Sequence, residues 1–89
     1  MLVAEAQALA AIKRLVALDR VLYTHHAQVR MIERGARRRD VEHALLGATS
    51  ATEQRDRGCW RVEGGVDLDG DDLTVVVALE ADVVVVTLF

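Results

Sequence analysis

The stretch "LTVVVALEADVVVVTLF", residues 73–89, decides the fold class. It contains two runs of β-branched residues on either side of Ala81 and Asp82, and such residues favour extended strands. Two strands with so short a connection pair antiparallel as a hairpin. The stretch therefore predicts two antiparallel strands, at residues 72–80 and 82–89.

Both faces of this hairpin are apolar. Strict alternation puts one set of valines on one face: Val75, Val77, Val83 and Val85. The other face then receives Val76, Ala78, Val84, Val86 and Leu88. A sheet with one wet face would alternate apolar with polar residues. We therefore expect the helices to cover one face fully and the other in part, and a second protein chain to cover the remainder, in a homo-oligomer or a hetero-complex.

Upstream of the hairpin, period-two patterning continues. In "GCWRVEG", residues 58–64, Trp60 and Val62 alternate with polar neighbours, which predicts a strand over 58–66 with both residues on one face. "VDLDGDD", residues 66–72, carries an Asp-Gly turn signal. Residues 49–55 form a weaker strand pattern, and residues 20–23 fit either an extended link or a first strand. Together these patterns predict an antiparallel sheet of three to four strands.

The first half of the sequence has helical periodicity. Residues 2–18 are rich in alanine and leucine, with one apolar stripe formed by Leu2, Leu9, Ile12 and Val16. We expect another chain to bury part of this stripe. Thr24 and Gly35 are typical residues to begin and end a second helix, and a third should run from Arg38 to Leu46. The prediction is one α+β domain over residues 1–89, with the first helix as an addition.

Charge is unevenly distributed along the chain. The sum is −3, yet residues 20–39 contain six arginines and one acid, whereas residues 40–89 contain eleven acids and three arginines. This pattern favours one small anion site, or docking of the basic segment on the acidic half, over a wholly basic polyanion-binding surface. No apolar run is long enough to span a bilayer, no export signal is recognisable, and Cys59 is alone. A cytoplasmic protein without membrane attachment is expected.

His26, Arg30 and Arg34 are the candidate site within that basic segment. Their i, i+4, i+8 spacing places them on one ridge beside Ala27 and Met31. Two like charges at this spacing repel, so either an internal acid such as Glu33 or Glu63, or a bound phosphate, should offset them. The helix dipole disfavours a charged imidazole in the first turn. A histidine beside two arginines suits RNA transesterification, and a solvated, salt-bridged helix edge is the simpler alternative.

The sequence predicts neither a metal site nor a cofactor site. His25 and His26 with His43 or Cys59 lack the spacing of metal ligands. "DLDGDD" departs from a calcium-binding loop in its glycine position and in its missing final glutamate. An acidic hairpin turn is the better interpretation of that segment.

The segment "YTHHAQVRMIERGARRRDVEHAL" resembles a large family of small bacterial proteins of uncharacterised function. Their pattern is H-A-x-x-R-M-x-x-R-G-(I/V)-x-x-x-(D/E)-V, followed by a valine-rich hairpin. The matching residues are His26, Ala27, Arg30, Met31, Arg34, Gly35, Asp40 and Val41, then Val85, Val86 and Thr87. The resemblance covers about residues 22–89.

That family is similar to RelE-like toxins of the barnase–EndoU–colicin–RelE group. The resemblance implies a RelE-like fold and a metal-independent endoribonuclease that cleaves mRNA, free or on the ribosome, paired with an antitoxin protein. It also implies that His26, Arg30, Arg34 and Thr87 form the catalytic site. The alternative is a non-catalytic interaction or dimerisation module, which the acidic balance and the doubly apolar strands favour.

Overall fold

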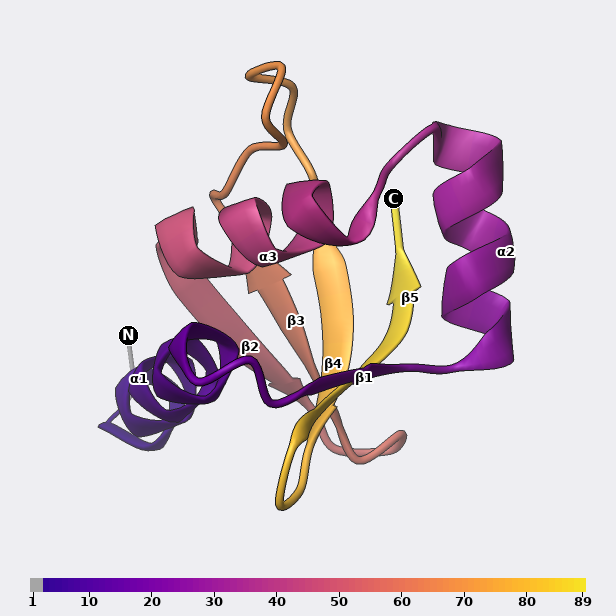
Figure 1. The fold of residues 1–89 in the computed structure, drawn as a ribbon. Coiled ribbons are helices and arrows are strands. Elements are labelled where there is room, and N and C mark those ends of the chain that lie inside the picture. Colours follow the sequence, from indigo (N-terminus) through magenta and orange to yellow (C-terminus); the bar gives the residue numbers. More distant parts are fainter. Residues whose placement is uncertain (1–2) are drawn as a thin grey trace.

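A computed structural model describes residues 3–89 of the chain as an α+β fold (Figure 1). In chain order its elements are α1 (Val3–Ala17), β1 (Val21–Tyr23), α2 (His25–Arg34), α3 (Arg38–Gly47), β2 (Ser50–Gln54), β3 (Cys59–Glu63), β4 (Val75–Leu79) and β5 (Val83–Leu88). No helix in this part of the chain is both long and apolar enough to cross a lipid bilayer.

The strands form one mixed sheet in the order β1-β5-β4-β3-β2. Neighbours pair antiparallel except β1, which runs parallel to β5. The expected antiparallel sheet of three to four strands is therefore wrong in both strand number and direction. Three residues at 21–23 are too few for an alternation pattern, and a parallel partner lies some 60 residues away along the chain. Neither fact is visible in local periodicity.

The strands of the hairpin and of "GCWRVEG" occur where the sequence predicts them, with shorter bounds. Trp60 pairs with Val77 and Val62 with Val75, so the two lie on the same face, as predicted. β3 stops at Glu63 because Gly64 takes a φ of 93°, which glycine adopts freely and which turns the chain out of the sheet.

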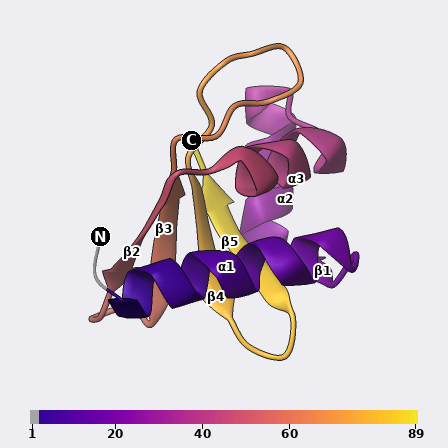
Figure 2. The ribbon, with the colours of Figure 1, turned by 90° about the vertical axis from the view of Figure 1, so that its left-hand side faces the viewer.

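All three described helices lie to one side of the sheet or at its edge (Figure 2). α1 packs on β2 and β5, α3 on β3 and β4, and α2 along β5. Ile12 and Val16 of α1 are buried in the chain's own core, not left for another chain to cover, and Leu9 packs partly buried beside them. Leu2 lies outside the described residues. No described helix covers the opposite face, where Val84 and Val86 are only half-buried.

A β-bulge changes which residues of β5 face the core. Val77 pairs with Val85 and Val76 with Thr87, so Val86 has no partner in β4. Beyond an extra residue, side chains swap faces. Leu88 therefore lies on the core face with no exposed surface, and Thr87 on the opposite face. The expectation that Leu88 shares a face with Val84 was wrong, because strict alternation cannot include a bulge.

Shortening the side chain of Leu88 tests whether this residue faces the core. Leu88→Ala should lower the free energy of unfolding by about 2–5 kcal/mol, because it leaves a cavity in the core. Val84→Ala, on the half-exposed face, should lower the free energy of unfolding by clearly less. Urea unfolding of both variants measures the difference, and equal losses would mean that Leu88 does not face the core.

Candidate functional site

The second helix, α2, begins and ends at the residues that the sequence indicates. The Thr24 hydroxyl accepts a hydrogen bond from the Ala27 N–H at 3.0 Å, which caps the first turn. Gly35 has a φ of 72°, the left-handed conformation that glycine permits at a helix end. The Ala36 N–H then donates to the Met31 carbonyl at 2.9 Å. These two caps fix the length and the direction of the helix that carries the ridge.

One stripe of α2, Ala27 and Met31, is buried against the core. With 3.6 residues per turn, His26, Arg30 and Arg34 lie on one flank of that stripe. Gln28 and Ile32 lie on its other flank. The predicted ridge therefore exists as one side of α2, and it is the side next to the last residues of β5.

Arg30 contacts the end of β5 directly. Its Nε donates to the Leu88 carbonyl at 3.3 Å, and a terminal nitrogen donates to Glu33 at 3.1 Å. The side chain is 37% exposed. Glu33 thus supplies the internal acid that the simpler alternative requires, and offsets part of the repulsion between the two arginines. Glu63, the other acid considered, instead lies 3.4 Å from Arg61.

Arg34 contacts a different segment. Its terminal nitrogen donates to the Asp72 carbonyl at 2.6 Å, which ties α2 to the chain just before β4. A guanidinium has five N–H donors, so one bond in Arg34 and two in Arg30 leave donors free in both residues. The contacts hold both groups in place and leave each able to bind an anion.

These contacts complete the edge of the sheet. β1 ends at Tyr23, so the outer edge of β5 beyond that point has no strand beside it. The carbonyls of Val85 and Val86 accept bonds from the Thr24 N–H and hydroxyl, and Leu88 accepts from Arg30. An unpaired strand carbonyl that is shielded from water costs free energy. This side of α2 therefore stabilises the edge of β5, in addition to its candidate chemical role.

His26 and Thr87 complete the predicted set. His26 is exposed and makes no hydrogen bond or ion pair within the described residues. Thr87 lies on the helix-free face, where it lines a hollow of about 770 Å³ with Val86, Arg61 and Phe89. Arg30 reaches this strand through Leu88, next to Thr87 in the chain. The structure thus brings Arg30 to the strand that carries Thr87, and it records no contact between Thr87 and His26.

A second cluster was not identified from the sequence. The Tyr23 hydroxyl donates to Glu42 at 2.9 Å, and the Arg38 guanidinium lies 5.1 Å from the centre of the Tyr23 ring. Burial and the bond to Glu42 raise the pKa of Tyr23 well above its ordinary value, and the contact with Tyr23 raises the pKa of Arg38. Strand β1 and helix α3 bring these residues together, and no spacing pattern could have linked them.

Asp40 explains how α3 begins at an arginine. Its carboxylate accepts the N–H of Arg37 at 2.8 Å and the N–H of Leu68 at 3.0 Å. These two backbone bonds hold the pKa of Asp40 below its usual value. Asp40 therefore supplies the N3 half of a capping box, while the Arg37 side chain makes no capping hydrogen bond to the first turn. Among residues 3–89, no three His, Cys, Asp or Glu side chains gather as metal ligands would.

Removing the cap of α2 should loosen the ridge. Thr24→Ala should lower the free energy of unfolding by about 1 kcal/mol or somewhat more, since both the cap and the bond to Val86 are lost. Thr24→Ser keeps a hydroxyl and should remain close to wild type. Thermal melts compare the three proteins; if serine destabilises as much as alanine, the hydroxyl contacts are not what holds α2.

Comparison with known proteins finds one family. Its model, described as "Domain of unknown function (DUF4258)", matches residues 23–89. The match begins at the last residue of β1 and includes α2, α3 and the four strands that follow, but not α1. No curated protein and no solved structure gives a significant match.

Proposed function

We propose, for a chain that belongs to the DUF4258 family, that it is the toxin of a bacterial toxin–antitoxin system and cleaves mRNA without a metal ion. The observation that carries the proposal is the junction between α2 and β5. There an exposed histidine stands one turn from an arginine whose guanidinium is fixed on the Leu88 carbonyl. The resemblance to RelE-like toxins supports the same function. It also leads us to propose that the fold is RelE-like.

The proposed reaction is a transesterification. His26 accepts the proton of an RNA 2′-hydroxyl, the 2′-oxygen attacks the adjacent phosphorus, and the bond to the 5′-oxygen of the next nucleotide breaks. A proton returned to that oxygen completes the step and leaves a 2′,3′-cyclic phosphate. Arg30 and Arg34 would bind the phosphate oxygens with their remaining N–H groups. Their anchored positions suit this role, because preorganised donors need no rearrangement when charge develops.

Induced expression provides the first test. The wild-type protein should arrest bacterial growth, and Arg30→Ala should relieve the arrest through loss of the phosphate contact. Arg39→Ala removes an exposed arginine without a recorded ion pair, and it should leave the arrest unchanged. Thermal melts of both variants show whether the fold persists. If the wild-type protein is harmless and cleaves no RNA with or without ribosomes, the proposal fails.

A second function is favoured by the uncovered face of the sheet. Val84 and Val86 are half-buried there and Phe89 is 44% exposed, so an interaction or dimerisation module would have an apolar surface to offer. In that case Val84→Lys should abolish self-association while the monomer remains folded. Sedimentation showing a monomer at high micromolar concentration would count against this second function.

A further inference from the structure

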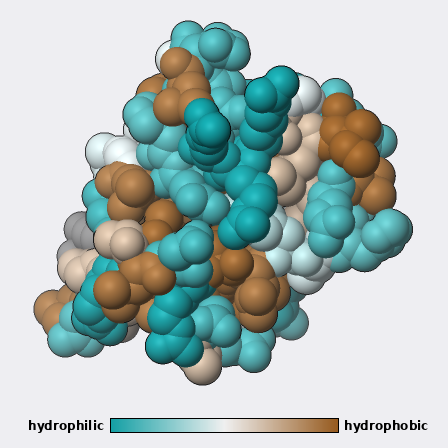
Figure 3. Space-filling model, in the orientation of Figure 1, coloured by the Kyte–Doolittle hydropathy of each residue, from teal (hydrophilic) through white to brown (hydrophobic). Residues whose placement is uncertain are grey.

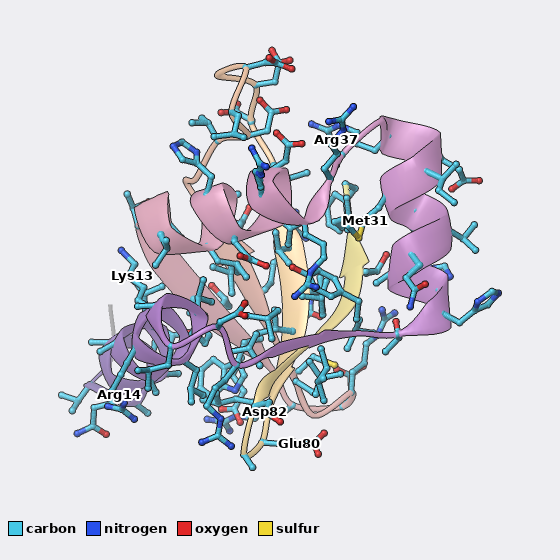
Figure 4. All side chains as sticks on the ribbon, viewed as in Figure 1. Lys13, Arg14, Met31, Arg37, Glu80 and Asp82 are labelled. Atoms are coloured by element: carbon cyan, nitrogen blue, oxygen red, sulfur yellow. The ribbon has the colours of Figure 1, made fainter. Side chains whose placement is uncertain are left out.

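The free edge of β1 borders an apolar hollow on the other flank of α2, away from the ridge. The hollow measures about 540 Å³, and its lining includes Leu22, Tyr23, Met31, Ile32, Ala36 and Arg38. In Figure 4, Met31 reaches from α2 toward the sheet, and Arg37 stands at the end of the gap between α2 and α3. Figure 3 shows apolar surface exposed both on α2 and where β1 crosses this face.

Backbone groups of β1 are available beside this hollow. Arg20 and Thr24 bond to β5 through the Arg20 carbonyl and the Thr24 N–H. Peptide groups alternate in direction along a strand, so those of Val21 and Tyr23 point away from β5. The Tyr23 carbonyl accordingly accepts a bond from the Gln28 side chain, on the outer side. Gln28 therefore covers one of these groups, and the remaining part of the edge can serve as a template for another strand.

The side chains around this edge of β1 favour a binding partner with apolar and acidic residues. Leu22 is 55% exposed and Ile32 is 82% exposed, one on each side of the hollow. Arg38 is the one charged residue in the lining, and it lies 3.8 Å from Glu42 and 3.9 Å from Asp19. The exposed Arg37 and Arg39 beside it make no ion pair within the described residues. A second copy docked edge to edge would bring the same arginines against each other, which disfavours self-pairing.

We propose that β1 binds an extended acidic segment of another protein, which joins the sheet as an added strand. Its alternate apolar side chains enter the hollow between Tyr23, Met31 and Ala36, and its carboxylates face Arg37, which makes no ion pair within the described residues. Main-chain hydrogen bonds would supply affinity, and the hollow with its arginines would supply selectivity. The surface is separate from the His26 ridge, so this proposal stands whether or not the chain cleaves RNA.

Selection from a library of random short peptides displayed on phage tests the proposal. Peptides retained by the wild-type protein should alternate apolar with acidic residues. One selected peptide is then synthesised, with a control in which lysine replaces every acid. Ile32→Glu should weaken binding of the selected peptide about tenfold or more, because it sets a carboxylate against the acidic strand. Val3→Glu, at a comparably exposed position on α1, should bind as wild type does.

Amide exchange of the complex distinguishes an added strand from other modes of binding. The N–H groups of Val21 and Tyr23 should gain protection when the selected peptide binds. The proposal is overturned if selection enriches basic or non-alternating peptides or none, if the lysine control binds equally, or if these amides gain no protection. Self-association that Ile32→Glu abolishes, or protection of the same amides by an RNA oligonucleotide, would assign the edge to another occupant and overturn it as well.

Discussion

Replacing His26 with alanine is expected to slow RNA cleavage by about 10²- to 10⁴-fold, the contribution typical of a general acid–base residue. The imidazole is exposed and has no recorded partner in the described structure, so its removal should leave the melting temperature unchanged. Growth arrest on induction should disappear together with cleavage. The measurements are a plating assay, a cleavage assay with purified protein, and a thermal melt.

His25 provides the matched control for this substitution. It is the adjacent residue, also exposed and in the same first turn of α2, but it lies off the ridge of His26 and Arg30. His25→Ala should therefore cleave RNA and arrest growth like the wild-type protein. Full toxicity of His26→Ala would remove the enzymatic assignment. A His26→Ala protein that no longer folds would instead show that the ridge is structural.

Gly65→Ala is expected to cause a large loss of stability. Gly65 is buried, and a Cβ added there would collide with the backbone carbonyl of Ala44 in α3. Backbone cannot move aside as a flexible side chain can, so the loss should reach or exceed about 1–3 kcal/mol in the free energy of unfolding. The Gly65 carbonyl also accepts the Leu73 N–H at 3.2 Å, so displacement would disturb the entry to β4.

Gly47→Ala is the comparison for that measurement. Gly47 ends α3, its φ is not positive, and a Cβ there would meet no heavy atom within 4 Å. Alanine should stabilise the protein by about 0.4–1 kcal/mol, chiefly by restricting the unfolded chain. Urea unfolding curves of the two variants should therefore shift in opposite directions. A Gly65→Ala protein as stable as wild type would mean that α3 does not approach this glycine closely.

Local patterns predicted most elements of this fold because each depends on neighbouring residues. The cap at Thr24, the stop at Gly35 and the strand pairing of Trp60 and Val62 all follow from short-range chemistry. The parallel pairing of β1 with β5 and the bulge at Val86 depend on contacts between distant segments. The bulge reversed the sequence-based assignment of Leu88, and the parallel pairing added one strand to the sheet.

The sequence likewise predicted only part of the candidate site. Helical periodicity was sufficient to place His26, Arg30 and Arg34 on one ridge. It could not show that Arg30 and Arg34 donate to the Leu88 and Asp72 carbonyls, because those acceptors come from other parts of the chain. For the same reason the contact between Tyr23 and Glu42 had no signal in the sequence.

The most direct test of the proposed chemistry is the structure of the RNA ends that the purified protein produces. A short RNA is incubated with the wild-type protein in the presence of a metal chelator, alone and with ribosomes, and the products are analysed by mass spectrometry. A fragment ending in a 2′,3′-cyclic phosphate is expected, together with no cleavage when the nucleotide before the scissile bond lacks its 2′-hydroxyl. Cleavage of that deoxy substrate, or products formed only without the chelator, would contradict a transesterification carried by His26 and Arg30.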